Sequence, residues 1–87
     1  MPTQSPTIKV QVEIKRGMRR TFELTAAQEH ALETVDNMGR VSDAVPFPTA
    51  RSMVRKGLLA QVGPVWVITS LGYVVRSRVR AKRRAGR

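Results

Sequence analysis

The sequence is poor in the residue types that small proteins use to reinforce a fold or to perform chemistry. It has no cysteine, one histidine, six acidic residues and, as aromatics, one tryptophan, one tyrosine and two phenylalanines. Without cysteine, neither a disulfide nor a thiolate metal site can support the fold. His30 has no histidine or cysteine near it, so we expect a solvent-facing helix residue. No metal-ligand spacing, glycine-rich phosphate loop or nucleophile triad appears, which predicts no catalytic residue, no metal, no cofactor and no enzyme.

Long hydrophobic runs are also missing. No apolar run approaches the roughly 20 residues that a membrane-spanning helix needs. The start of the chain, MPTQSPT, lacks the basic and apolar regions of a signal peptide. Residues 1–6 contain two prolines and small polar residues, which predicts a disordered N-terminus. Together these features predict a cytoplasmic protein with no membrane partner.

The charge is strongly one-sided. Sixteen lysines and arginines against six acidic residues give a net charge of +10. Much of the excess lies at the C-terminal end, in Arg76, Arg78, Arg80, Lys82, Arg83, Arg84 and Arg87, with no acidic residue among them. Such a segment predicts a polyanionic partner such as nucleic acid or an anionic membrane, and the membrane is the weaker candidate because the segment lacks an apolar face to insert. A solubilising tail that binds any polyanion weakly explains the pattern equally well.

Residues 7–24 alternate in the period of a β-strand. Ile8, Val10, Val12 and Ile14 alternate with polar residues, Gly17 provides a turn, and Phe22 and Leu24 continue the apolar face. We therefore expect a β-hairpin over 7–24. Its turn adds Arg16, Arg19 and Arg20 as candidate phosphate contacts. Its exposed edge could pair with a protein partner or with a second copy, giving a homodimer.

A helical period follows the hairpin. Thr25 and Gln28 have the spacing of a capping box, and Gly39 suits the position just past a helix. The apolar face between them is predicted to contain Ala27, Ala31, Leu32, Val35 and Met38. Prolines 46 and 48 then leave room for at most one helical turn, between Ser42 and Ala44.

A second short helix is predicted over 49–56. Thr49 can cap it, or Pro48 can occupy its first position, and Gly57 ends it. Ala50, Met53, Val54 and Leu58 form its inner face. Two apolar segments around Gly63 and Pro64 predict another hairpin. A last helix should start at Thr69 or Ser70, with Leu71, Val74, Val75 and Val79 inward. The fold class is therefore α+β.

Two phrases in this second half resemble a known family. MVRKGLL, residues 53–59, resembles a recognition helix that stops at a glycine and runs into a wing strand. WVITSLG, residues 66–72, places Trp66, Ile68, Thr69 and Gly72 in the pattern of a returning wing strand and closing helix. Over 25–80 the chain is thus similar to small MarR-like winged helix-turn-helix proteins. The resemblance implies three main helices and a two-stranded wing, here with an added N-terminal hairpin and a basic tail over 81–87. It also places Trp66 in the core beneath the wing.

The chain departs from that family in two places. Pro46 and Pro48 leave almost no second helix in the motif. The wing tip, residues 60–65, contains no charge, where the family usually has arginine or lysine for gripping phosphate.

The resemblance and the basic helix together predict binding to double-stranded DNA, as a small transcriptional regulator or a nucleoid-associated architectural factor. Arg51, Ser52 and Arg55 are the candidates for base contacts, and Thr49 and Lys56 for phosphate contacts. An ordinary solvated helix face is the alternative explanation. Two other functions stay open: a protein-interaction module, such as a phage factor acting on a host protein, and RNA or ribosome binding through the arginine-rich end.

Overall fold

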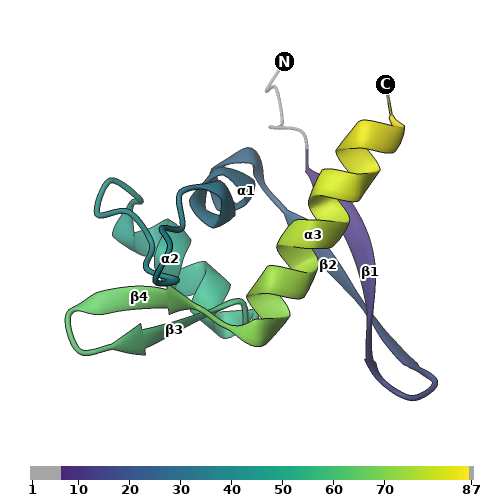
Figure 1. Ribbon diagram of the computed structural model, residues 1–87, viewed down its shortest axis with the longest axis horizontal. Helices are drawn as coiled ribbons and strands as arrows, with labels where there is room; N and C mark the ends of the chain where they lie inside the picture. The colour runs from purple at the N-terminus through teal and green to yellow at the C-terminus, as the bar shows by residue number, and fades with distance from the viewer. Residues whose placement is uncertain (1–6, 87) are drawn as a thin grey trace.

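The chain folds into an α+β arrangement, which confirms the expected fold class. The computed structural model describes residues 7–86, so the expected disorder of residues 1–6 and the position of Arg87 lie outside it. Along this part of the chain the elements are β1 (Ile8–Lys15), β2 (Met18–Leu24), α1 (Ala26–Glu33), α2 (Phe47–Arg55), β3 (Leu59–Val62), β4 (Val65–Ile68) and α3 (Ser70–Ala85). The strands form two antiparallel two-stranded sheets, β1-β2 and β3-β4, at opposite ends of the molecule (Figure 1).

The predicted N-terminal hairpin is confirmed. Val10 pairs with Phe22 and Ile8 with Leu24, and all four side chains are buried on one face. That face packs against α3 and α1. Ile14 continues the alternation in sequence but is 44% exposed. The reason is a break in the register between Glu13 and Lys15, beyond which the turn projects from the body (Figure 1).

Helix α1 begins as predicted and ends earlier. The Thr25 hydroxyl accepts a hydrogen bond from the Gln28 amide, and the Gln28 side chain accepts one from the Thr25 amide, which completes the capping box. Ala27 is exposed, and Gln28 occupies a buried position instead. The expected continuation to Met38 is wrong, because the helix stops at Glu33 and Met38 is 74% exposed.

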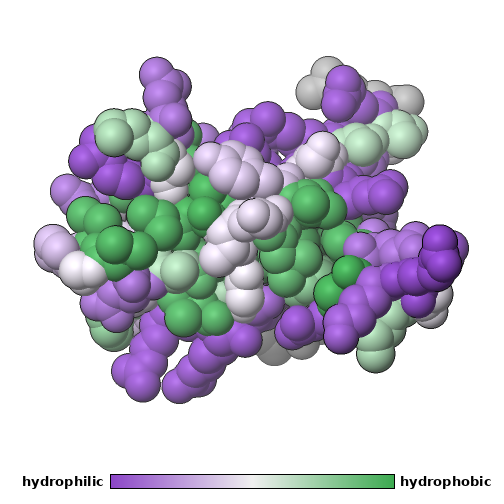
Figure 2. Space-filling model, turned by 60° about the horizontal axis from the view of Figure 1, so that its bottom comes forward, coloured by the Kyte–Doolittle hydropathy of each residue, from purple (hydrophilic) through white to green (hydrophobic). Residues whose placement is uncertain are grey.

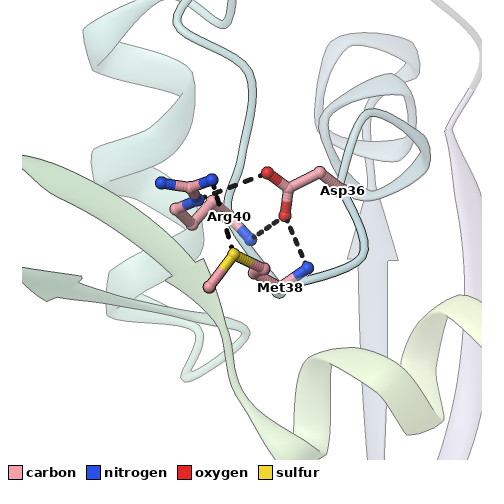
Figure 3. Close-up of polar contacts among 3 residues, drawn as sticks. All are labelled: Asp36, Met38 and Arg40. Carbon is pink, nitrogen blue, oxygen red and sulfur yellow. Dashed lines mark hydrogen bonds and ion pairs between the residues drawn. The ribbon is translucent and has the colours of Figure 1, made fainter.

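A loop organised by Asp36 explains why the helix stops early. The Asp36 carboxylate accepts hydrogen bonds from the Met38 amide at 2.8 Å and from the Arg40 amide at 2.9 Å, and it pairs with the Arg40 guanidinium (Figure 3). These bonds to the backbone hold the pKa of Asp36 below its ordinary value. Gly39 has a φ of 80°, so its role is in this loop rather than directly past the helix.

The loop delivers residues 39–41 to the edge of strand β4. The Ile68 amide donates to the Gly39 carbonyl at 2.8 Å, and the Val41 amide donates to the Trp66 carbonyl at 2.9 Å. Arg40 therefore lies opposite Val67 in an isolated bridge. The chain then makes one turn, closed by the Val45 amide on the Ser42 carbonyl. This agrees with the single turn that the prolines permit.

Helix α2 starts two residues before the predicted position. Pro46 precedes its first residue, Phe47, and Pro48 follows in the first turn, without a side-chain cap. Of the two expected starts, the Thr49 cap is therefore wrong, whereas Pro48 lies in the first turn, one residue from its expected first position. Proline suits the first turn of a helix because it lacks the amide hydrogen that would need a cap and because its φ is already helical. Gly57, with a φ of 81°, ends the helix, and the Leu58 amide returns to the Met53 carbonyl.

Helix α3 starts where expected and is longer than its apolar stripe. Thr69 caps it, with its hydroxyl accepting from the Gly72 amide at 3.0 Å. Val75 and Val79 are buried, whereas Val74, predicted to face inward, is exposed. The segment predicted as a basic tail continues the helix as far as Ala85.

All elements share one hydrophobic core. Leu24, Leu32, Met53, Leu58, Leu59, Val75 and Val79 are its largest fully buried side chains. Trp66 packs against this core and meets the Phe47 ring edge to face, in agreement with its predicted place. None of the described helices has the length and apolar character needed to cross a membrane.

Candidate nucleic-acid interface

Two arginines lie on the same solvent-exposed side of helix α2. Ala50 and Met53 face the core, which leaves Arg51 and Arg55 exposed on the opposite side. They are four residues apart and therefore lie one above the other, one helical turn apart. Among residues 7–86, neither forms an ion pair with a carboxylate. Their guanidinium groups are accordingly available to a ligand.

The other polar residues predicted for this face turn toward the protein. The Ser52 hydroxyl donates to the Thr49 carbonyl at 2.7 Å and accepts from the Gln28 side chain at 2.8 Å. The Lys56 ammonium donates to the Glu23 carbonyl and to Gln28 Oε1. Burial lowers the pKa of Lys56, with the charge of Glu23 acting in the opposite direction. Ser52 and Lys56 therefore anchor α2, and the half-buried Thr49 contributes its carbonyl to the same contact.

Gln28 is the residue that connects these contacts, and its tertiary role was missed. Its side chain is 7% exposed and bonds Thr25, Ser52 and Lys56 at once. The capping-box spacing signalled the first of these bonds. The sequence held no signal for the other two, since they join residues 24 and 28 positions apart along the chain. Gln28 thereby fixes the orientation in which α2 presents Arg51 and Arg55.

The junction of α2, β3 and α3 depends on Thr69 and Gly72. The Thr69 hydroxyl donates to the Gly57 carbonyl at 2.6 Å, and its amide donates to the Leu58 carbonyl at 3.0 Å. A Cβ on Gly72 would lie 2.3 Å from the Leu58 carbonyl oxygen, so only glycine permits this approach. The residues of the WVITSLG phrase therefore join the end of α2 to the start of α3.

Two of the C-terminal arginines are engaged with helix α1. The Arg80 guanidinium forms a two-pronged pair with Glu33, at 3.0 and 2.6 Å, and Arg83 pairs in the same way with Glu29. The hydrogen bond from Arg80 lowers the pKa of Glu33, and each arginine pKa is raised by its partner. The pairs hold the basic end of α3 along α1. Free positive charge in this segment is thus lower than the sequence suggests.

The remaining predicted cations are spread over several places. Lys82 donates to the Lys9 carbonyl, Arg76 lies over the Tyr73 ring, and Arg78 adjoins β1. Arg84 is exposed, and Arg87 lies outside the described residues. In the hairpin, Arg16 is exposed in the turn, Arg19 lies opposite Glu13, and Arg20 covers the Phe22 ring. The structure thus groups Arg51 with Arg55 and does not gather the other cations around them.

The outer face of the β3-β4 hairpin is apolar. Leu59 and Ile68 are paired and buried, so the pairs Ala60–Val67 and Val62–Val65 point to the other side. Val62 is 56% exposed. Figure 2 shows apolar surface gathered over this end of the molecule, with hydrophilic side chains around its margin. This hairpin therefore has no cation with which to grip phosphate, as its sequence indicated.

Comparison of the chain with protein-family models, with curated proteins and with solved structures found no significant match. Among residues 7–86 there is also no group of three or more histidine or acidic side chains placed to hold a metal ion.

Proposed function

We propose that the chain is a DNA-binding protein of winged-helix type, with α2 as its recognition helix. The observation that carries the proposal is the exposed pair Arg51 and Arg55 on a helix whose other polar residues are anchored inward. A helix of this size fits the major groove, and arginine can donate two hydrogen bonds to guanine O6 and N7.

The order and contacts of the elements support the winged-helix interpretation. α1 is followed by an extended segment, then by α2, a β-hairpin and a closing helix. The extended segment 39–41 pairs with β4, so a single bridge at Arg40 extends the β3-β4 wing beyond β4. In this interpretation the single turn at 42–45 stands in for the second helix of the motif. Contacts from Gln28 then supply the support that a second helix would give.

On this proposal, sequence selection and general affinity come from different residues. Arg51 and Arg55 select bases, whereas cations on α3 such as the half-buried Arg76 and the exposed Arg84 add phosphate contacts. Each neutralised phosphate steepens the dependence of log K on log salt by about 0.9. Because Arg80 and Arg83 are paired with carboxylates, we expect a shallower slope than the net charge of +10 suggests.

Titrations with duplex DNA and with structured RNA at several salt concentrations test this function. We expect tighter binding to duplex DNA, and a loss of affinity when Arg51 and Arg55 are replaced by alanine. Replacing Arg76 and Arg84 by alanine removes the same charge and is the matched control. Because Arg76 and Arg84 are assigned only phosphate contacts, the control should weaken binding to all DNA sequences alike and keep the preference among them. An equal loss of sequence preference in the two double variants, or a preference for RNA, would contradict the proposal.

A protein-interaction module is the second candidate function. It is favoured by the uncharged, apolar outer face of the wing, formed by Ala60, Val62, Val65 and Val67. Exposed apolar surface of this kind is typical of protein contacts rather than of phosphate contacts. Replacing Val62 with lysine should leave DNA binding intact or improve it if the first proposal holds. Loss of a protein partner in that variant would support the second.

A further inference from the structure

Strand β1 has a free edge, and two lysine contacts establish which of its residues face it. In an antiparallel pair, residues alternate between those that hydrogen-bond to the partner strand and those whose N–H and C=O point away. Lys9 lies opposite Glu23, and both carbonyls accept from lysines outside the hairpin, Lys82 and Lys56. This pair therefore points away from the ladder. Because this alternation repeats every two residues, the backbone N–H and C=O groups of Gln11 and Glu13 also point to the free edge of β1.

A groove follows this edge beneath helix α3. The groove consists of two adjoining hollows. The first is lined by Gln11, Glu13, Arg19 and Arg78. The second is lined by Lys9, Val10, Gln11, Arg78, Ala81 and Lys82. Arg78 and Gln11 line both hollows. Four of the lining side chains are basic and one, Glu13, is acidic. The groove thus combines unpaired strand backbone with a positive wall.

We propose that this groove binds an extended peptide with acidic side chains, which adds to β1 as a third strand of the hairpin. The peptide backbone would pair with Gln11, Glu13 and the Lys9 amide, since the Lys9 carbonyl already accepts from Lys82. Its acidic side chains would meet Arg78 and Lys82 of α3. This site uses neither Arg51 nor Arg55, so the inference goes beyond the proposed DNA-binding function.

The length of the site is set by the two ends of the regular ladder. The register is unbroken from Ile8 to Glu13 and shifts before Lys15, where the strand no longer offers regular pairing. A bound strand therefore pairs over residues 9–13. This contact is short, so charge complementarity must contribute to the affinity.

Other occupants fit the groove less well. A second copy would bring the same basic side chains, Lys9, Arg78 and Lys82, against their own counterparts, and like charges repel. Nucleic acid would meet the Arg78 and Lys82 charges, but its phosphates cannot donate hydrogen bonds to the free carbonyls of the edge. A peptide strand provides both donors and acceptors in the required alternation.

The test uses the full chain and a fluorescently labelled peptide of alternating glutamate and valine residues, long enough to cover residues 9–13. A second peptide has the same sequence with every backbone nitrogen methylated, which preserves its charge and prevents strand pairing. We expect the first peptide to bind about tenfold more tightly than the second, because methylation removes several backbone hydrogen bonds. Binding should also shift the amide resonances of Gln11 and Glu13. Equal affinity of the two peptides, or shifts confined to other elements, would overturn the proposal.

Two pairs of variants locate the site. Gln11→Pro removes an edge donor of β1, and Thr21→Pro makes the same change at the paired position on β2, so only the first should weaken binding. If Gln11→Pro does not fold, Arg78→Glu and Arg84→Glu provide a second comparison of equal charge, of which only Arg78→Glu should weaken binding. Equal effects within a folded pair would overturn the proposal. Dimerisation of the chain without peptide, abolished by Gln11→Pro, would also overturn the proposal. A loss of peptide binding in the Arg51→Ala, Arg55→Ala variant as large as that in Arg78→Glu would overturn it too.

Discussion

At the scale of single residues, Gln28 is the side chain on which the most contacts depend. One buried amide caps α1 and holds both Ser52 and Lys56 of the α2 region. Replacing it by alanine leaves these groups without their partner in a partly buried place. We expect Gln28→Ala to lower the free energy of unfolding by about 1–3 kcal/mol. Chemical denaturation measures this, with the exposed Gln61→Ala as control, and equal stability of the two variants would contradict the assignment.

Gly72 is the residue at which the close packing of α3 can be tested. An added methyl group would lie 2.3 Å from the Leu58 carbonyl oxygen and 2.6 Å from Ile68 Cγ1. Because backbone must move to make room, we expect Gly72→Ala to cost about 1–3 kcal/mol or more. Gly86→Ala is the control, since its nearest neighbour would be 3.4 Å away. A melting temperature of Gly72→Ala equal to that of the control would show that α3 does not approach Leu58 and Ile68 so closely.

Asp36 and Glu33 make stability depend on pH at acidic values. Backbone hydrogen bonds lower the pKa of Asp36, and the bond from Arg80 lowers that of Glu33. A carboxyl with a depressed folded-state pKa stabilises the fold above its unfolded pKa, and this contribution is lost as pH falls through the folded value. Stability should therefore decline below the ordinary values of 3.8 and 4.5. Asp36→Asn should flatten this decline in denaturation curves measured over pH. A decline as steep in the variant as in the unaltered chain would contradict the assignment.

At the scale of elements, local signals located most of the helices and strands. Alternation predicted the first hairpin, the capping box predicted the start of α1, and Gly57 predicted the end of α2. Three boundaries or roles differed from the predictions, and only the last depended on contacts distant in sequence. The Asp36 carboxylate closes a loop where the apolar spacing predicted more helix. Of the two expected starts of α2, the one with proline in the first turn is found, and the Thr49 cap is not. Ser52 and Lys56 turned inward because Gln28, 24 and 28 residues away in sequence, lies against them.

The pairing between α1 and α3 gives a prediction about charge. If Glu29 and Glu33 are both replaced by glutamine, Arg83 and Arg80 lose their partners and become free to contact phosphate. Stability should change little at the exposed Arg80–Glu33 pair and more at Glu29, whose side chain is only 16% exposed. If both arginines then contact phosphate, the salt dependence of DNA binding should steepen by about 0.9 for each.

The matched control for this experiment removes two carboxylates elsewhere. Glu13→Gln with Asp43→Asn changes the net charge equally and leaves both ion pairs of α3 intact. Salt slopes should therefore differ between the two double variants. Identical slopes would mean that overall charge alone, and not release of Arg80 and Arg83, governs the interaction.

At the scale of the whole molecule, the charge count alone does not show which cations are paired within the protein. The basic C-terminal segment suggested a free tail, but as far as Ala85 it is helix, with Arg80, Lys82 and Arg83 engaged by α1 and β1. What stays free on α2 is the pair Arg51 and Arg55. Composition cannot show this, because it does not encode which acidic residues fold against which basic ones.

The central claim is that α2 selects a DNA sequence, and repeated selection from a random duplex pool tests it most directly. The full chain is used at moderate salt, because Val79 belongs to the core and α3 cannot be truncated before it. We predict enrichment of a short motif containing guanine, lost in the Arg51→Ala, Arg55→Ala variant and retained in Arg76→Ala, Arg84→Ala. No enrichment with the unaltered chain, or the same motif with Arg51 and Arg55 removed, would contradict the claim.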